Sequence, residues 1–382
     1  GETDRVSLDR MCSSYGFVAS KFLFAFQTRE LRGEVRDFRA FRNRLVAALG
    51  KKPVVLGIAV PDVNSADMCT SGFELAVKWQ DRLSNGLGYN IGFSLSDARS
   101  KVVKYLNNPT GNLGGYIEGE YLGDIYGYET VGIAQSKEEM ERHLDQLDQN
   151  YYNTHGVWPA EPRKGQSGLG DDWNAGDIMY ADINGDGKVD GGKGTLADPG
   201  DQRIIGNSTP RYNFGLVLDA SYKGFDVSIF FQGVGKRDYA PIVGTNGAVF
   251  WGAVNNIWQS MAMEEHFDYF RPEGHPMGAN LNGYYPRPDF TSNKNHQVQT
   301  RYLQDASYIR LKNLQIGYTL PKQWINKLHI NRCRVYVSGD NLWTGTSLAS
   351  MFDPETLAAG DWGSGKTYPL SKVISFGLNV NF

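Results

Sequence analysis

The sequence predicts an all-β fold, a transmembrane antiparallel β-barrel with long loops at one end. Three observations predict it. Apolar and polar residues alternate in one segment after another, and 13% of the 382 residues are aromatic while 45 are glycine, which suits strands and turns. The connections between these segments are very short at one end and very long at the other. That asymmetry is typical of outer-membrane barrels.

The composition excludes several other classes of protein. A net charge of −3 argues against a nucleic-acid binder that works through bulk charge. No uninterrupted apolar run reaches about 18 residues, so we expect no membrane-spanning helix. The three cysteines are scattered and odd in number, which argues against a disulfide framework and against a cysteine metal site.

The clearest hairpin is expected between residues 71 and 96. Its first strand places four apolar residues on one face: Phe73, Leu75, Val77 and Trp79. A turn at Ser84-Asn85-Gly86 follows, and the second strand alternates in the same way through Tyr89, Ile91, Phe93 and Leu95. Residues two apart share a face of a strand, so this hairpin has one apolar and one polar face.

Similar patterns return downstream. Residues 214–222 and 225–232 alternate on either side of a tight Lys223-Gly224 turn, which predicts a second hairpin. The apolar positions change phase around Lys312-Asn313, where we expect a β-bulge. A last strand, 375–382, alternates up to Phe382, which lies on its apolar face. Alternating segments of this kind number about ten.

Two long stretches between the hairpins, residues 107–175 and 235–297, are rich in Gly, Asn and Asp and are expected to be loops. Within the first, the sequence predicts a helix from Lys137 to Gln149. Its apolar side would consist of Met140, Leu144 and Leu147.

Alternation alone fits a soluble β-sandwich equally well. Two features favour the barrel. The apolar face is heavily aromatic, as the girdles of membrane barrels are, and the final strand stays apolar up to Phe382.

A succession of motifs across residues 53–382 carries a family likeness. The longest runs from Gly176 to Asp190 (GDIMYADINGDGKVD). The others are TSGFEL at 70–75, DIYGYE at 124–129, DQRIIGN at 201–207, YKGFD at 222–226, SYIRLKN at 307–313 and VSGDNL at 337–342. In content and order these motifs resemble the SusC/RagA family of TonB-linked outer-membrane transporters.

This resemblance implies a 22-stranded outer-membrane barrel in contact with lipid, with an N-terminal plug inside it. It also implies a SusD-like lipoprotein as a lid, uptake driven by the TonB complex, and oligosaccharides or peptides as cargo. Nucleic acid is not among the expected partners. The chain would then be part of a nutrient importer of the outer membrane.

The domain organisation expected from the resemblance has two parts. Residues 1–52 match the family poorly and are expected to be a divergent or foreign start, while residues 53–382 form the C-terminal part of the barrel. About ten strands are roughly half of the 22 in such transporters. Half a barrel would leave two edges whose hydrogen bonds lipid cannot satisfy. We therefore expect the chain to be a C-terminal fragment.

The sharpest candidate site is a loop of the calcium-binding type. Its expected ligands are Asp182, Asn184, Asp186, the carbonyl of Lys188, and Asp190. Gly187 would make the sharp bend between them. The twelfth position, normally a bidentate Glu, is Lys193, so a carboxylate outside the loop, such as Asp198 or Asp201, would have to complete the site. The alternative is a turn rich in Asp and Asn that holds no metal.

No catalytic set is recognised, so we expect no enzyme activity. Acidic residues cluster in one loop (Glu118, Glu120, Asp124 and Glu129), but nothing fixes the paired-carboxylate distance that glycoside hydrolysis needs. Five loop tryptophans could stack on sugar rings, although packing or girdle roles are favoured for each: Trp158, Trp173, Trp251, Trp258 and Trp362. Two rival functions remain, a soluble calcium-dependent glycan-binding β-sandwich and an outer-membrane barrel enzyme such as a protease or lipase.

Overall fold

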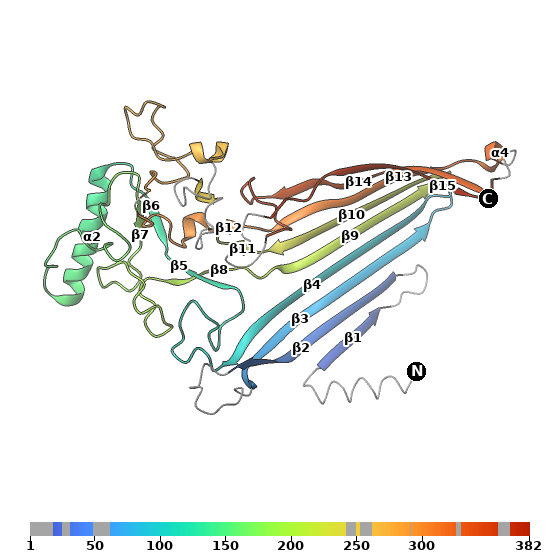
Figure 1. Cartoon of the computed structure of the whole chain (residues 1–382). Coiled ribbons are helices and arrows are strands. Elements are labelled where there is room, and N and C mark those ends of the chain that lie inside the picture. Colours follow the sequence, from blue (N-terminus) through green and yellow to red (C-terminus); the bar gives the residue numbers. More distant parts are fainter. Residues whose placement is uncertain are drawn as a thin grey trace, which may run out of the picture.

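One antiparallel sheet and a body of packed loops at one of its ends make up the structure (Figure 1). The computed structural model describes residues 18–24, 31–48, 62–241, 250–252, 262–290, 292–325, 330–357 and 367–382, with side chains from residue 66 onward. Of the expected start segment, residues 1–52, the structure describes only the backbone of 18–24 and 31–48. Its origin stays a prediction.

The sheet has nine strands within the described residues, where the sequence suggested about ten. They are β1 (Val18–Phe24), β2 (Leu31–Ala48), β3 (Asp62–Arg82), β4 (Gly88–Tyr105), β9 (Arg211–Tyr222), β10 (Phe225–Lys236), β13 (Tyr308–Thr319), β14 (Arg332–Thr346) and β15 (Val373–Asn381). Each strand pairs with its neighbours in that order, all antiparallel. Every connection in the sheet therefore joins neighbouring strands, as in an up-and-down barrel wall.

Both predicted hairpins are confirmed. β3 pairs with β4 with Leu75 opposite Leu95, and β9 pairs with β10 across the Lys223-Gly224 turn. Both turn residues have positive φ, 47° and 92°, which is the backbone of a type I′ turn. The predicted bulge is also confirmed, because the pairing of β13 with β14 shifts between Leu311 and Asn313 and leaves Lys312 without an opposite residue.

A row of apolar residues crosses the sheet from strand to strand. Directly opposed residues along it are Trp79, Ile91, Leu218, Ile229 and Leu314. Within the described residues no second sheet covers this face, and Phe376 of β15 is 85% exposed. This arrangement differs from a β-sandwich, in which two sheets bury their apolar faces against each other.

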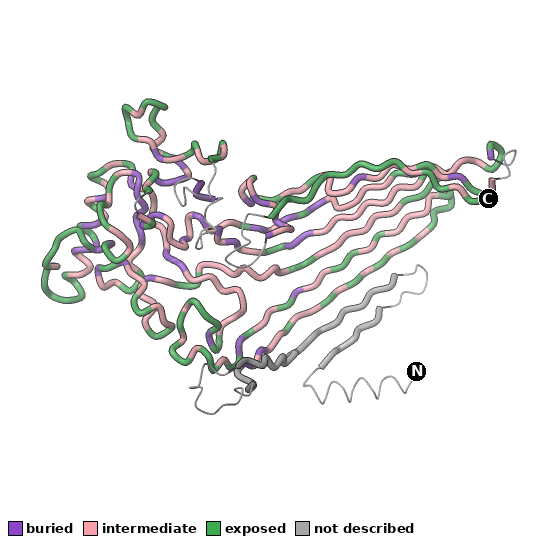
Figure 2. Tube along the Cα trace, in the orientation of Figure 1, coloured by how far each residue is buried: buried purple, intermediate pink, exposed green. Residues whose placement is uncertain are grey.

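The loops, in contrast, contain a hydrophobic core of their own, as the buried segments at the loop end in Figure 2 show. Three two-stranded sheets organise them: β5 (Asp124–Gly127) with β8 (Arg203–Asn207), β6 (Thr130–Ile133) with β7 (Ile178–Tyr180), and β11 (Asp238–Tyr239) with β12 (Gln304–Asp305). Short helical turns are η4 (Glu264–Phe267), η5 (Thr300–Tyr302) and α4 (Lys322–Ile325), the last at the opposite end of the sheet. We call the packed loops the loop body.

The one long helix of the loop body is α2 (Lys137–His155), six residues longer than predicted. It begins at Ser136, whose hydroxyl accepts a hydrogen bond from the Glu139 amide, and ends at Gly156 in the left-handed conformation. Its last turns carry no apolar period, so the helix was predicted too short, although Gly156 is a recognisable stop signal. The predicted apolar side is confirmed, since Met140, Leu144 and Leu147 are buried. No helix in the described ranges is long and apolar enough to cross a membrane.

Candidate functional site

The predicted calcium-type loop forms a tight turn whose carboxylates hold backbone amides. The two oxygens of Asp182 accept hydrogen bonds from the amides of Gly185 and Gly187, at 2.7 and 2.9 Å. Asp186 accepts one from the Lys188 amide at 2.8 Å. Gly187 makes the expected bend with φ of 81°, and a Cβ there would lie 2.4 Å from Tyr151 of α2. Glycine is therefore required at this position.

Of the two outside carboxylates, only Asp201 joins the loop. It is fully buried and accepts hydrogen bonds from the amides of Ile183 and Asp190, at 2.7 and 2.9 Å. Burial raises the pKa of the Asp201 carboxyl to about 6, against the effect of these amides. Asp198 is instead directed to Lys193, 3.7 Å away.

The geometry does not bring the loop's acids together as metal ligands. Asp190 accepts from the Gly192 amide, and the Asn184 oxygen accepts from the Asp186 amide. Within the described residues, no group of three or more His, Cys, Asp and Glu side chains is placed to hold a metal ion. Calcium binding at this loop stays a prediction.

A buried ionic network holds the loop body together, and sequence patterns did not indicate it. Asp177 is fully buried and pairs with the guanidinium of Arg287 at 2.7 Å and with the ammonium of Lys294 at 3.1 Å. Lys294 is also almost fully buried, and it donates to the carbonyls of Asp171 and Asp172 at 2.8 Å. A buried ion pair is tolerated only when its remaining hydrogen bonds are satisfied, as they are here.

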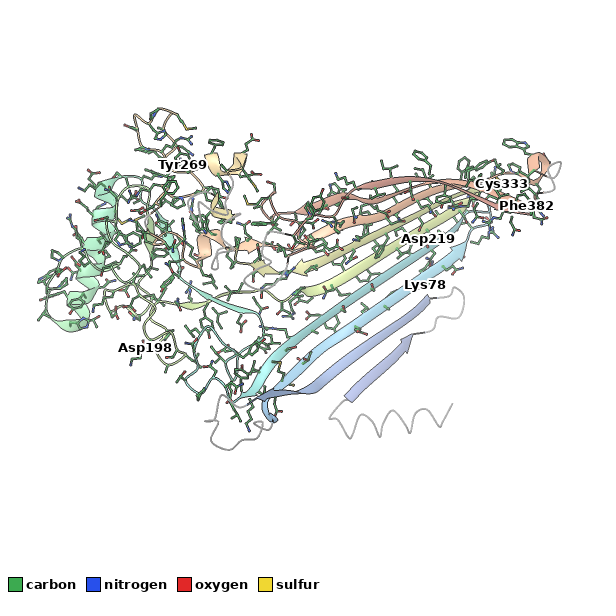
Figure 3. All side chains as sticks on the ribbon, in the orientation of Figure 1. Lys78, Asp198, Asp219, Tyr269, Cys333 and Phe382 are labelled. Atoms are coloured by element: carbon green, nitrogen blue, oxygen red, sulfur yellow. The ribbon has the colours of Figure 1, made fainter. Side chains whose placement is uncertain are left out.

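The face of the sheet opposite the apolar row carries a continuous polar row. Directly opposed residues along it are Gln80, Asn90, Asp219, Ser228, Gln315, Ser338 and Ser375. Asp219 is its centre and accepts hydrogen bonds from Asn90 at 2.7 Å and from Ser228 at 2.6 Å. Figure 3 shows Asp219 and Lys78 toward the end of the sheet that lies away from the loop body.

A cavity of about 830 Å³ lies over this polar row, near the short turns. Lys78, Arg82 and Asp226 line it together with Asn90 and Asp219. Asp226 also binds the guanidinium of Arg334 across the intervening strand β13. This is possible because Gly317 lies between them, where a Cβ would come within 2.5 Å of the guanidinium. The polar face is thus built for water or polar partners rather than for a packed core.

The loop tryptophans fall into different environments. Trp251 is buried in the hydrophobic core of the loop body, and Trp173 packs against that core. Both therefore have the packing role that the sequence favoured over sugar stacking. Trp158 is 59% exposed and stacks on Tyr152 with ring centroids 4.8 Å apart. Trp258 and Trp362 lie outside the described residues.

Sequence comparison places the chain among known proteins. No family model matches it. TonB-dependent receptor P3 of Formosa agariphila is 27% identical over 361 residues, and TonB-dependent receptor P39 of the same organism is 24% identical over 370 residues. Each match covers 86% of this chain. The chain is related to TonB-dependent receptors. This relation confirms the resemblance seen in the motifs.

The fold agrees with that relation. The RagAB peptide transporter structure superposes with a TM-score of 0.61 at 20% identity, over 92% of this chain. The closed-closed state of the RagAB peptide importer gives a TM-score of 0.59, over 94% of this chain. These likenesses show that the fold is similar to part of the RagAB transporter chain. The matched proteins are named as receptors and transporters, which fits the expectation of a chain without enzyme activity.

The chain spans about a third of the length of the proteins that it matches. The matches cover 30% of receptor P3, 32% of receptor P39 and 33% of the RagAB transporter chain.

Proposed function

We propose that this chain is the C-terminal part of the wall of a TonB-dependent nutrient importer of the outer membrane. The observation that carries the proposal is the two-faced sheet with its long loops at one end. Its apolar row would face lipid, its polar row would face the interior, and the loop body would lie on the extracellular side.

In the complete protein we expect a closed 22-stranded barrel. β1 and β15 are the edges of the nine-stranded sheet within the described residues, and an unpaired strand edge in lipid costs several kcal/mol for each unmet backbone group. The remainder of the longer protein would supply the other strands and the plug. On this proposal residues 53–382 are barrel wall, and residues 1–52 are a divergent start whose β1 and β2 extend the same sheet.

The partners proposed follow from the relation and not from the geometry. A SusD-like outer-membrane lipoprotein would cover the loop body, and the TonB complex would act through the N-terminal part. The cargo would be an oligosaccharide or a peptide, and RagAB, whose fold is similar, is described as a peptide importer. A glycan-binding β-sandwich is disfavoured, because the apolar face is uncovered in the part of the chain that the structure describes.

The test uses the full-length protein that contains this chain. It should fractionate with outer membranes and support uptake of an oligomer too large for porins, and dissipating the inner-membrane proton gradient should abolish that uptake. Recovery as a soluble periplasmic monomer, or uptake that needs no energy, would contradict the proposal.

A further inference from the structure

A second cavity, of about 490 Å³, lies where β4 meets the loop body. The chain that follows β4 folds back along its end. The Val102 amide donates to the Glu120 carbonyl and the Leu122 amide to the Ser100 carbonyl, both at 2.9 Å. Ser100 bonds Thr70 on the polar face of the sheet, and Val102 is two residues further along the same face. The cavity is therefore held in place by backbone pairing, on the side proposed to be the barrel interior.

Four tyrosines line this cavity: Tyr105, Tyr116, Tyr121 and Tyr126. The first two meet edge to face, with centroids 5.4 Å apart and planes at 82°. The guanidinium of Arg99, which does not line the cavity, covers the ring of Tyr121 at 3.6 Å. These contacts fix the orientation of three of the four rings.

The cavity also carries two carboxylates without a cationic partner. Asp124 accepts hydrogen bonds from the side-chain amide of Asn207 at 2.7 Å and from the Tyr121 amide at 3.0 Å, both neutral groups. Glu120 is half-buried, and no ion pair holds its carboxylate in the described part of the chain. Burial raises the pKa of the Tyr126 hydroxyl, and the charges of Glu120 and Asp124 raise it further. The ammonium of Lys101 lies 5.8 Å from the Tyr121 ring but, like Arg99, does not line the cavity, so the charged side chains of the cavity wall are both acidic.

We propose that this cavity binds an organic cation, the ammonium or guanidinium of a basic side chain in a peptide cargo. Faces of aromatic rings attract such cations, and a carboxylate beside them forms a charge-assisted hydrogen bond. A neutral sugar would also stack on the tyrosines, but it would leave both carboxylates without a counter-charge. The inference rests on the proposed function and selects basic peptides among its possible cargoes.

The test is a titration of the purified full-length protein with acetyl-Gly-Lys-Gly-amide. The matched probe is the same peptide with an acetylated, neutral lysine. Wild type should bind the cationic peptide at least tenfold more tightly, and this preference should shrink in 0.5 M NaCl because salt screens charge.

Two variants and one control locate the binding. Glu120→Gln should reduce the preference for the cationic peptide to near unity. Tyr116→Leu, at a ring that is 50% exposed, should weaken cationic binding several-fold. Glu161→Gln removes the same charge at an exposed position away from the cavity and should change nothing.

Three results would overturn the inference. They are equal binding of the two peptides by wild type, an unchanged preference for the cationic peptide in Glu120→Gln, and binding of maltotriose but of neither peptide. If Glu120→Gln does not fold, the salt dependence of wild-type binding and the effect of Tyr116→Leu still test the inference. Binding is measured without transport, so the two proposals fail separately. Energy-dependent uptake without cation preference removes only this inference, whereas cation binding by a protein that does not import removes only the proposed function.

Discussion

Asp177 and Lys294 illustrate how single residues hold the loop body. Both are buried and form an ion pair, in which Asp177 also binds Arg287 and Lys294 also lies 3.9 Å from Asp289. Asp177→Ala removes the nearer of the two carboxylates that face the buried Lys294 ammonium, and breaking such a buried pair typically costs about 3–5 kcal/mol. We expect the loop body of this variant to become sensitive to protease while the barrel still assembles.

The matched control for that change is Asp171→Asn. Asp171 pairs with Lys164 at the surface, where an ion pair contributes about 0–1 kcal/mol, and its carbonyl contact to Lys294 does not involve the side chain. Equal protease resistance of Asp177→Ala and Asp171→Asn would contradict a stabilising role for the buried network.

His296 predicts how the loop body responds to acid. Its ring stacks on Trp251 with centroids 4.2 Å apart, and burial lowers the pKa of the imidazole to about 4. The folded state thus binds a proton more weakly than the unfolded chain, whose histidines titrate near 6.5. The contribution of His296 to the stability of the loop body is therefore fully present above about pH 6.5 and is lost as the pH falls toward 4.

We expect His296→Phe, which keeps the stacking and removes the titration, to flatten this loss. The measurement is protease resistance of the loops between pH 7 and pH 4.5. His143, whose pKa burial also lowers, acts in the same direction, so part of the pH dependence should remain. If protease resistance of His296→Phe falls with pH as it does in wild type, the pH dependence belongs to other groups.

Among the elements, the loop from Asp182 to Asp190 offers a direct test of calcium. If calcium orders it, adding the ion should raise protease resistance there, and Asp186→Ala should abolish the rise without affecting barrel assembly. Asp182→Ala is less selective, since Asp182 also holds the amides of Gly185 and Gly187 without any metal. Wild-type protein that does not respond to calcium would establish the plain turn.

The last strand of the sheet, β15, pairs as its alternation predicts. Its pairing sets Phe376 opposite Val337 and Leu378 opposite Val335, while Asn379 faces Arg334, which confirms the expected division of faces. Phe382 follows the strand and is 80% exposed, so it contributes little packing to the described part of the chain.

The elements differ in how well the sequence predicts them. The hairpins and the bulge at Lys312 were predicted because strand faces follow a period of two within a few residues. The ion pair of Asp177 with Lys294 joins residues 117 positions apart, and no local period reports such a contact. The sequence left two candidates, Asp198 and Asp201, for the carboxylate that joins the loop, because the approach of Asp201 to Ile183 depends on how the loop closes.

On the scale of the whole molecule, the hydrophobic core lies in the loops and not in the sheet. Residues of the core cluster all come from segments outside the nine strands of the sheet, and Figure 2 shows few buried residues along those strands. The sheet is suited to lipid on one face and to polar groups on the other, whereas the loop body is folded as a water-soluble domain is. The two parts should therefore unfold separately.

Leu144→Ala tests that separation. Leu144 lies on the buried side of α2, and truncating such a residue to Ala typically costs about 2–5 kcal/mol of folding free energy. We expect the loop body to melt at a lower temperature by tryptophan fluorescence, with no change in the heat-modified mobility of the barrel on a gel. Val157→Ala, at a side chain that is 59% exposed, is the control and should shift neither transition. A joint loss of both transitions would mean that loops and sheet unfold as one unit.

The shared core of the loop body also bears on engineering. Figure 3 shows loops from distant parts of the sequence meeting in one mass, with Asp198 and Tyr269 on different sides of it. Asp177 belongs to one loop, whereas Arg287 and Lys294 belong to another. Moving a single loop to another barrel would therefore separate the acid of this network from its two bases. The smallest transplantable unit is therefore the complete set of loops, exchanged together as one cassette on a retained scaffold of strands.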